Sequence, residues 1–405
     1  MIDGIVVGGG PAGMFAAITA AKQGERVLLL EKNNRLGKKL LITGKGRCNV
    51  TNHTNAQGVL ENIPRNSRFL YSSMAAFPPE KIEAFFEEQG CALKVERGNR
   101  VFPVSDRSQS VLQALQSALR QNHVAVETAH VTGIRTENGT VTGVEADGRF
   151  LTAKWLILAT GGLSYPTTGS TGDGYKLAQQ AGHTLVEPVP SLVSLVSRDP
   201  DCKKMMGLAL KNVTLTLLED GKAIFDEQGE MLFTHFGISG PLTLSASSHL
   251  GDMKKHRYIA EIDLKPALSE EQLYDRITRD FALLANHAAQ GALVKLLPSS
   301  MQPVMVARWG IDPATKANQI TREQKRELVQ LVKHWQVSID ARGDLAHAVI
   351  TSGGVSVREV DPKTMQSKKA LGLYFAGEVL DVDAYTGGYN LQIAFCTAQS
   401  FANNL

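Results

Sequence analysis

The sequence predicts an α/β protein built around a parallel sheet, and three observations near its N-terminus predict it. The β-branched run I-V-V at residues 5–7 is typical of a buried parallel strand. A G-x-G-x-x-G motif over residues 8–13 follows at once and leads into an apolar helix pattern. A second apolar strand over residues 27–30 then ends in Glu31. Strand, glycine turn, helix, strand and terminal acid together indicate a Rossmann-type unit that binds a dinucleotide.

Each residue of this motif has a physical role. Gly8 permits the tight turn, Gly10 lets the backbone approach a pyrophosphate, and Gly13 lets the helix pack closely on the strand. We expect the helix over residues 12–23, with its N-terminus facing the phosphates. Glu31 stands where a carboxylate would accept hydrogen bonds from a ribose 2′-hydroxyl. FAD and NAD both use this unit, so the motif leaves the cofactor open, and a glycine-rich turn without a ligand is the alternative.

Composition narrows the class of protein. A chain of 405 residues is too long for one ordinary core, so two domains are expected. No apolar run approaches the ~20 residues of a membrane span, and no signal-peptide pattern precedes the first strand, so we expect a cytoplasmic protein without a membrane partner. The cysteines, Cys48, Cys91, Cys202 and Cys396, form no C-x-x-C pair. This spacing favours neither a disulfide framework nor a metal site, and any redox chemistry therefore needs a cofactor.

Residues 32–52 are rich in glycine, asparagine and cations and poor in helical or strand periodicity, which predicts an extended binding loop. The net charge of the chain is only +3, so charge over the whole molecule decides little. Residues 35–47 of this loop, in contrast, contain five cations and no acid: Arg35, Lys38, Lys39, Lys45 and Arg47.

The G-K-K segment and the T-G-K-G-R-C-N-V-T-N run at residues 43–52 resemble a family of bacterial NAD(P)/FAD-dependent flavoproteins. This HI0933-like family includes a bile-acid-inducible flavoprotein and a ribosomal-RNA dihydrouridine synthase. Three later stretches resemble it in order: A-T-G-G at 159–162, F-T-H-F-G-I-S-G-P at 233–241, and the C-terminal signature at 377–390. The resemblance implies FAD and a glutathione-reductase-like FAD-binding domain. This sequence has G-E at 377–378 where many relatives of the superfamily have G-D, which leaves the geometry of that contact with the ribityl chain open.

The rest of the chain predicts a discontinuous FAD-binding domain, residues 1–188 and 349–405, interrupted by an inserted domain of strands and helices at 189–348 that would contact substrate. Four short strands separated by turn signals are expected, and this pattern predicts a small antiparallel meander. Further expected elements are helices at 77–89, 108–121, 174–181, 270–289, 291–295 and 321–334, meander strands at 124–127, 131–136, 141–146 and 150–153, and strands at 155–159, 191–196, 213–218, 223–225, 258–264, 348–355 and 373–376.

Motif and resemblance together imply a set of residues that bind FAD. Asp173 has an equally simple alternative, which is to cap the helix that follows it. The expected cofactor-binding residues are Gly8, Gly10, Pro11, Ala12, Gly13, Glu31, Lys32, Lys39, Gly44, Arg47, Cys48, Asn49, Val131, Thr160, Gly161, Gly162, Asp173, Gly377, Glu378, Gly388, Asn390 and Leu391.

The family reduces polarised C=C bonds, a reaction that needs a hydride on one carbon and a proton on the other. Candidate proton donors on the motif loops are Cys48, Tyr165, His235 and Tyr389. The cations beside Cys48 are expected to lower its thiol pKa, which would suit a nucleophile or redox sensor, but a buried packing cysteine is the preferred interpretation. No second G-x-G-x-x-G follows a strand, so NADPH or NADH would dock only transiently as electron donor.

The cations of residues 32–52, with Arg65 and Arg68, match a phosphate-bearing substrate better than an apolar sterol. We therefore expect a flavin-dependent dihydrouridine synthase acting on large-subunit (23S) ribosomal RNA, either naked or in a ribosome assembly intermediate. An NAD(P)H-dependent small-molecule enone reductase or oxidase is one alternative, and a non-catalytic flavin-containing RNA or ribosome binder is another. The sequence does not indicate an oligomeric state.

Overall fold

The computed structural model describes residues 2–403 and 405. Its internal contacts divide the chain into two compact units: unit 1 comprises Met1–Ser191 and Asp344–Leu405, and unit 2 comprises Leu192–Gly343. Each unit has a hydrophobic core of its own. The two units are therefore described one at a time.

Unit 1 is built on a parallel sheet with the strand order β20-β10-β1-β2-β6. The predicted α/β fold with a Rossmann-type domain is confirmed. Every residue of β1 and β10 is buried, in line with strands that are covered on both faces. The strands are β1 (Gly4–Val7), β2 (Val27–Glu31), β6 (Ala125–Thr128), β10 (Trp155–Leu158) and β20 (Leu373–Phe375).

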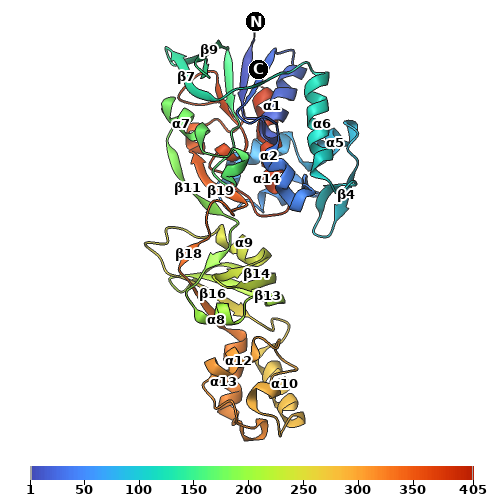
Figure 1. Ribbon diagram of the computed structural model, residues 1–405, viewed down its shortest axis with the longest axis vertical. Coiled ribbons are helices and arrows are strands. Elements are labelled where there is room, and N and C mark those ends of the chain that lie inside the picture. The colour runs from blue at the N-terminus through green and yellow to red at the C-terminus, as the bar shows by residue number, and fades with distance from the viewer. Residues whose placement is uncertain (1, 404) are drawn as a thin grey trace. The chain divides into compact units, whose positions relative to one another are not determined.

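Helix α1 (Pro11–Lys22) lies beside α14 (Tyr389–Ala402), which joins the two ends of the sequence in one core (Figure 1). Nine consecutive residues of α1, 12–20, are buried, as expected for a helix that is apolar on all sides. The ring of Phe15 on α1 packs against Phe77, Phe85 and Phe395, with centroids 5.0–5.3 Å apart. This aromatic cluster fixes α14, and with it the C-terminal signature, against the N-terminal motif.

The other helices of unit 1 cover the sheet or connect its strands. Helix α6 matches its prediction, whereas α2, α3 and α4 were not predicted, because they are short. These helices are α2 (Lys38–Ile42), α3 (Ala56–Leu60), α4 (Tyr71–Ala76), α5 (Pro79–Glu88), α6 (Ser108–Gln121) and α7 (Asp173–Gln180), with 3₁₀ turns at Thr43–Gly46, Ser67–Leu70, Pro166–Thr168, Val357–Glu359 and Gly377–Val379.

The prediction of an extended loop over residues 32–52 is wrong in part. This stretch contains α2, a 3₁₀ turn and a short strand, and Gly44, Lys45 and Cys48 adopt left-handed backbone angles. The left-handed residues break the periodicity that would have revealed these elements in the sequence.

Three small antiparallel sheets complete unit 1. The predicted meander is confirmed for three of its strands, but the first of the four, β6, instead pairs in parallel with β2 at the edge of the main sheet. The small sheets contain β3 (Thr51–Asn52), β4 (Leu93–Glu96) and β5 (Arg100–Pro103); β7 (Val131–Glu137), β8 (Thr140–Ala146) and β9 (Arg149–Thr152); and β11 (Leu185–Ser191) with β19 (Ile350–Val355).

Unit 2 consists of an antiparallel seven-stranded sheet, order β17-β16-β13-β14-β15-β12-β18, and a group of helices (Figure 1). The sequence predicted only short strands where the structure has the long hairpin β13–β14. Helix α12 and strand β17 were not predicted. The strands are β12 (Leu195–Val196), β13 (Ala209–Glu219), β14 (Lys222–Thr234), β15 (Gly237–Ser239), β16 (Tyr258–Asp263), β17 (Trp335–Ile339) and β18 (Ala341–Arg342). The helices are α8 (Pro200–Lys204), α9 (Pro241–Ser247), α10 (Glu270–Leu283), α11 (Ala289–Ala292), α12 (Gln302–Trp309) and α13 (Arg322–Lys333), with a 3₁₀ turn at Ala317–Gln319.

Within the described residues, no helix has the length and apolar character needed to cross a membrane.

Replacing Phe15 with alanine should destabilise unit 1 selectively. Truncating a buried phenylalanine costs about 3–5 kcal/mol, because the lost contacts leave a cavity. We expect Phe15→Ala to accelerate backbone hydrogen exchange, followed by mass spectrometry, in peptides of α1, α5 and α14 while peptides of unit 2 keep their protection. Phe150→Ala is the matched control, since Phe150 is 50% exposed. Equal effects of the two substitutions would contradict the central role of the aromatic cluster.

Candidate cofactor site

The glycine turn after β1 brings helix α1 unusually close to the sheet. Gly8 has φ of +109°, and its N–H donates a hydrogen bond to the Leu30 carbonyl at 2.8 Å. A Cβ on Gly13 would lie 1.8 Å from the Gly8 carbonyl oxygen, so no side chain fits there. The close contact requires glycine at both positions and leaves the first turn of α1 facing the space beyond β1.

That space is a cavity of unit 1, about 1290 Å³ including its open mouth. It lies at the carboxyl ends of the parallel strands, the edge where α/β sheets bind ligands. The predicted cofactor residues that line it are Gly8, Gly10, Pro11, Ala12, Glu31, Lys32, Lys39, Val131, Thr160, Gly161, Asp173, Glu378, Asn390 and Leu391.

Two features of the lining fit a bound dinucleotide. A Cβ on Gly10 would meet no protein atom within 4 Å, so protein packing does not explain the glycine, whereas a ligand that approaches the backbone does. Gly10 is also the N-cap residue of α1 and provides no side-chain cap, which leaves the helix N–H groups available to phosphate oxygens.

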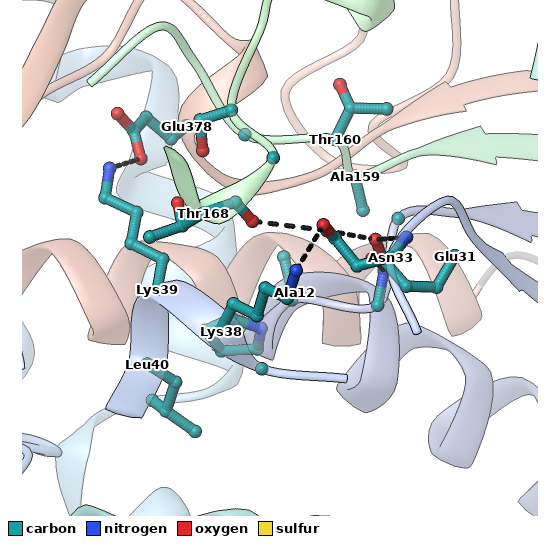
Figure 2. A pocket seen from close by; sticks show the side chains of 18 of the residues that line it. Ala12, Glu31, Asn33, Lys38, Lys39, Leu40, Ala159, Thr160, Thr168 and Glu378 are labelled. Carbon is teal, nitrogen blue, oxygen red and sulfur yellow. Dashed lines mark hydrogen bonds and ion pairs between the residues drawn. The ribbon is translucent and has the colours of Figure 1, made fainter. Parts of the chain in front are cut away.

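At the β2 side of the cavity, Glu31 is held in place by backbone and side-chain donors (Figure 2). Its carboxylate accepts hydrogen bonds from the Gly9 N–H at 2.6 Å and from the Asn33 N–H at 2.8 Å. The Asn33 amide also donates to the Thr168 carbonyl and accepts from Lys38 at 2.8 Å. Glu31 thus presents a fixed carboxylate at the place where the motif expects a ribose.

The same side of the cavity carries an ion pair between Lys32 and Asp173. The Lys32 ammonium donates to Asp173 at 2.5 Å, and His130 Nε2 lies 3.4 Å from the same carboxylate. Burial alone would raise the pKa of Asp173, but the Lys32 ammonium and the Thr171 hydroxyl more than offset this and hold that pKa below its usual range. Asp173 is the first residue of α7 and lines the cavity, but it does not cap the helix as the alternative expected: the N-cap residue is Gly172, and no side chain caps it.

On the β10 and β20 side, Lys39 and Glu378 form a second ion pair (Figure 2). The Lys39 ammonium donates to Glu378 Oε2 at 2.7 Å and to Ser164 Oγ at 2.5 Å. Glu378 Oε1 accepts from Ser164 Oγ at 2.9 Å and from the Thr351 N–H at 3.0 Å. Four chain segments therefore meet at one carboxylate.

Several predicted residues do not line the cavity but shape it. A Cβ on Gly162 would lie 2.4 Å from Thr351 Oγ1, and one on Gly388 would lie 2.4 Å from the Thr51 backbone. These glycines permit close approach of the segments that carry Glu378 and α14. The predicted residues outside the lining are Gly13, Gly44, Arg47, Cys48, Asn49, Gly162, Gly377 and Gly388.

Arg47 is engaged outside the cavity. Its guanidinium bonds to Glu96 at 2.9 Å and to Asp106 at 3.1 Å, and it stacks over the Phe102 ring at 4.0 Å. Both carboxylates lie about fifty or more positions later in the sequence, so the loop itself gave no sign of them.

The expected lowering of the Cys48 pKa is wrong. The Cys48 side chain is completely buried, and burial raises the pKa of its thiol to about 12. Arg47, the neighbour that was expected to stabilise a thiolate, points to Glu96 and Asp106 instead. Cys48 is therefore a neutral packing residue at ordinary pH.

The remaining proton-donor candidates occupy different places. Tyr389 is the half-buried first residue of α14, adjacent to two cavity residues, and burial raises the pKa of its phenol. His235 is exposed in the turn between β14 and β15 of unit 2, a hairpin rather than the expected loop. Tyr165 begins a 3₁₀ turn with φ of +53°.

Sequence reasoning missed several lining residues. Asn33 contacts Glu31 and Thr168, and His130 contacts Asp173. These contacts join residues that lie up to 135 positions apart in the sequence. Only Asn33 had a local signal, because it follows the strand-end acid by two positions. Among the described residues, no group of three or more histidine, cysteine or carboxylate side chains is placed to hold a metal ion.

Comparisons with known proteins extend these observations. The model of the family described as HI0933-like protein Rossmann domain matches residues 2–404. The chain is 31% identical to the 3-dehydro-bile acid delta(4,6)-reductase of Clostridium scindens, over 97% of this chain and 96% of that protein. It is 30% identical to the ribosomal RNA dihydrouridine synthase of Haemophilus influenzae, over 99% of this chain and 97% of that protein.

Among solved structures, the 3-ketosteroid delta1-dehydrogenase of Sterolibacterium denitrificans shares the fold with a TM-score of 0.50 at 14% identity. The match covers 99% of this chain and 98% of that one. Taken with the cavity, these matches show that the chain belongs to the HI0933-like Rossmann family and is an FAD-dependent oxidoreductase.

Proposed function

We propose that this enzyme reduces the C5–C6 double bond of a uridine in large-subunit (23S) ribosomal RNA and so forms dihydrouridine. The observation that carries the proposal is the match to ribosomal RNA dihydrouridine synthases over nearly the whole length of both chains. The product gains a hydride on one carbon and a proton on the other, and NADPH or NADH supplies the electrons. FAD, when bound, passes them to the substrate.

The residues present divide this work. Glu31 holds the ribose of the cofactor, and the N–H groups of α1 face its pyrophosphate. Of the candidates, we assign the proton to Tyr389: it does not itself line the cavity, but it begins α14, whose next two residues do, and burial raises the pKa of its phenol. Cys48 has no part in proton transfer in this scheme, since it is enclosed by the core.

Fewer cations are free to contact RNA phosphates than the sequence predicted. Lys32, Lys39 and Arg47 are paired with carboxylates, and Arg65 lies 3.6 Å from Asp381. Of the cations expected to contact a phosphate-bearing substrate, three are exposed and form no ion pair with a described residue: Arg35, Lys45 and Arg68. These three are the side chains that we propose contact RNA phosphates. The inserted stretch predicted at 189–348 is proposed to supply further substrate contacts.

The second candidate is reduction of a small-molecule enone. The bile acid reductase supports it, with an identity equal to that of the RNA enzymes within a few percent. The paired cations also support it, because they leave the cavity with little free positive charge. An apolar substrate would require no salt-sensitive binding step.

The purified enzyme with NADPH or NADH should convert uridine to dihydrouridine in 23S ribosomal RNA from a strain that lacks this modification. Mass spectrometry of the digested RNA measures the product. The control is RNA that already carries the modification, which should consume no reductant beyond background. Turnover of a 3-keto-4-ene steroid without any reaction on RNA would reverse the order of the two candidates.

Glu31→Gln should weaken FAD binding by roughly 10- to 100-fold, because a hydrogen bond to a charged group contributes about 1.5–3 kcal/mol. The neutral amide accepts a ribose hydroxyl less strongly and also loses part of its hold on the Gly9 N–H. Quenching of flavin fluorescence measures the affinity. Glu80→Gln, an exposed glutamate of α5, is the control, and an unchanged affinity in Glu31→Gln would remove Glu31 from the site.

Substituting the unpaired cations should weaken RNA binding in a salt-dependent manner. Arg35→Ala, Lys45→Ala and Arg68→Ala should each reduce the slope of log affinity against log salt by up to about 1, as expected when one phosphate contact is lost. Filter binding of ribosomal RNA over a salt series measures this slope. Lys94→Ala is the matched control, because Lys94 is paired with Asp106 at 2.7 Å. Identical slopes in all four variants would argue against this surface.

A further inference from the structure

We infer that the ion pair between Lys39 and Glu378 sets the reduction potential of the bound flavin: Lys39 stabilises the reduced form, and Glu378 positions Lys39 and limits its effect. The inference rests on the proposed use of FAD and deepens it. Three observations carry it: the place of the pair in the cavity, its spare hydrogen-bonding capacity, and the positions of the other charges.

The strand order places the pair at the end of the cavity opposite Glu31. Glu31 ends β2, whereas Ser164 follows β10 and Glu378 follows β20, in a sheet ordered β20-β10-β1-β2. Neighbouring strands lie about 4.8 Å apart, so the ends of β2 and β20 are separated by roughly 14 Å. If Glu31 binds the adenosine ribose and α1 the pyrophosphate, the flavin half of FAD lies on the side of Lys39 and Glu378.

The hydrogen bonds that Lys39 and Glu378 make within the protein leave each side chain able to bond to a ligand as well. An ammonium group has three N–H donors, and Lys39 uses one on Glu378 and one on Ser164. A carboxylate accepts about four hydrogen bonds, and Glu378 receives three, from Lys39, Ser164 and Thr351. One donor on Lys39 and one acceptor position on Glu378 therefore remain. Both side chains line the cavity, with 21% and 14% of their surface exposed.

No other charged side chain of the described lining competes at this end. The remaining charged or titratable lining residues belong to the β2 side. Lys32 and His130 contact Asp173. Lys38 bonds to Asn33 beside Glu31 (Figure 2). Of the charged groups in the described lining, one positive and one negative group therefore face the flavin half.

The two charges should act in opposite directions. Two-electron reduction leaves the flavin ring with an added negative charge at neutral pH, and nearby protein charge tunes this equilibrium. The Lys39 cation favours the reduced form. Glu378 opposes it, but its bond to the ammonium also keeps Lys39 in place. A pair that served only to brace the fold would not produce effects of opposite sign.

The test is the midpoint potential of the FAD-saturated protein, measured by redox-dye titration without substrate. Lys39→Met should weaken the affinity for reduced relative to oxidised FAD by at least tenfold, which lowers a two-electron potential by about 30 mV. Glu378→Gln should change the same ratio in the opposite direction, by at least threefold. Lys39→Arg, which keeps the charge, should stay within twofold of wild type.

Lys94→Met is the matched control: it removes a lysine that is paired with Asp106 at 2.7 Å outside the cavity lining, and it should change the ratio less than twofold. The inference is overturned if Lys39→Met and Glu378→Gln shift the potential in the same direction, or if neither shifts it. If Lys39→Met retains no FAD, the sign of the Glu378→Gln shift decides alone. A wild-type protein that binds no flavin would instead overturn the proposed function and this inference with it.

Discussion

The approach of Gly13 to the Gly8 carbonyl is the constraint on which the cofactor site depends. With no room for a Cβ at Gly13, the start of α1 lies directly behind the end of β1, and its unpaired N–H groups face the cavity. The aromatic cluster around Phe15 then fixes α14 against α1. Residues from both ends of the chain are therefore placed around one cavity by a contact between two glycines.

The parts of the fold that follow from local physics could be predicted from the sequence. The strands and helix of the N-terminal motif, helix α6 and the β7–β9 meander each have a period or turn signal contained within a few residues. Elements broken by left-handed residues, such as those between Lys38 and Asn52, have no such signal. The edge strand β6 was assigned to the wrong sheet because its partner, β2, is nearly one hundred residues earlier in the chain.

The candidate site divides in the same way. Glycines and the strand-end acid could be located, since each meets a local steric or hydrogen-bonding requirement. The partners of the cations could not, because Lys39 meets Glu378 at a separation of 339 positions and Arg47 meets Glu96 at a separation of 49. Three of the six cations in residues 32–52, Lys32, Lys39 and Arg47, are thus held in ion pairs with carboxylates. Cation content alone therefore overestimates the free positive charge available to a phosphate-bearing substrate.

The same pairing accounts for a glutamate rather than an aspartate at position 378. The carboxylate reaches Lys39, Ser164 and the Thr351 N–H at the same time, from a backbone that has just left β20. An aspartate carboxylate would lie one methylene closer to its own backbone, so it would not reach all three partners in their present positions. Because Lys39 and Glu378 are both charged and only partly exposed, loss of either partner would leave the other short of a counter-charge. The longer acid is thus matched to the lysine, and the two side chains form one ion-paired unit in the cavity lining.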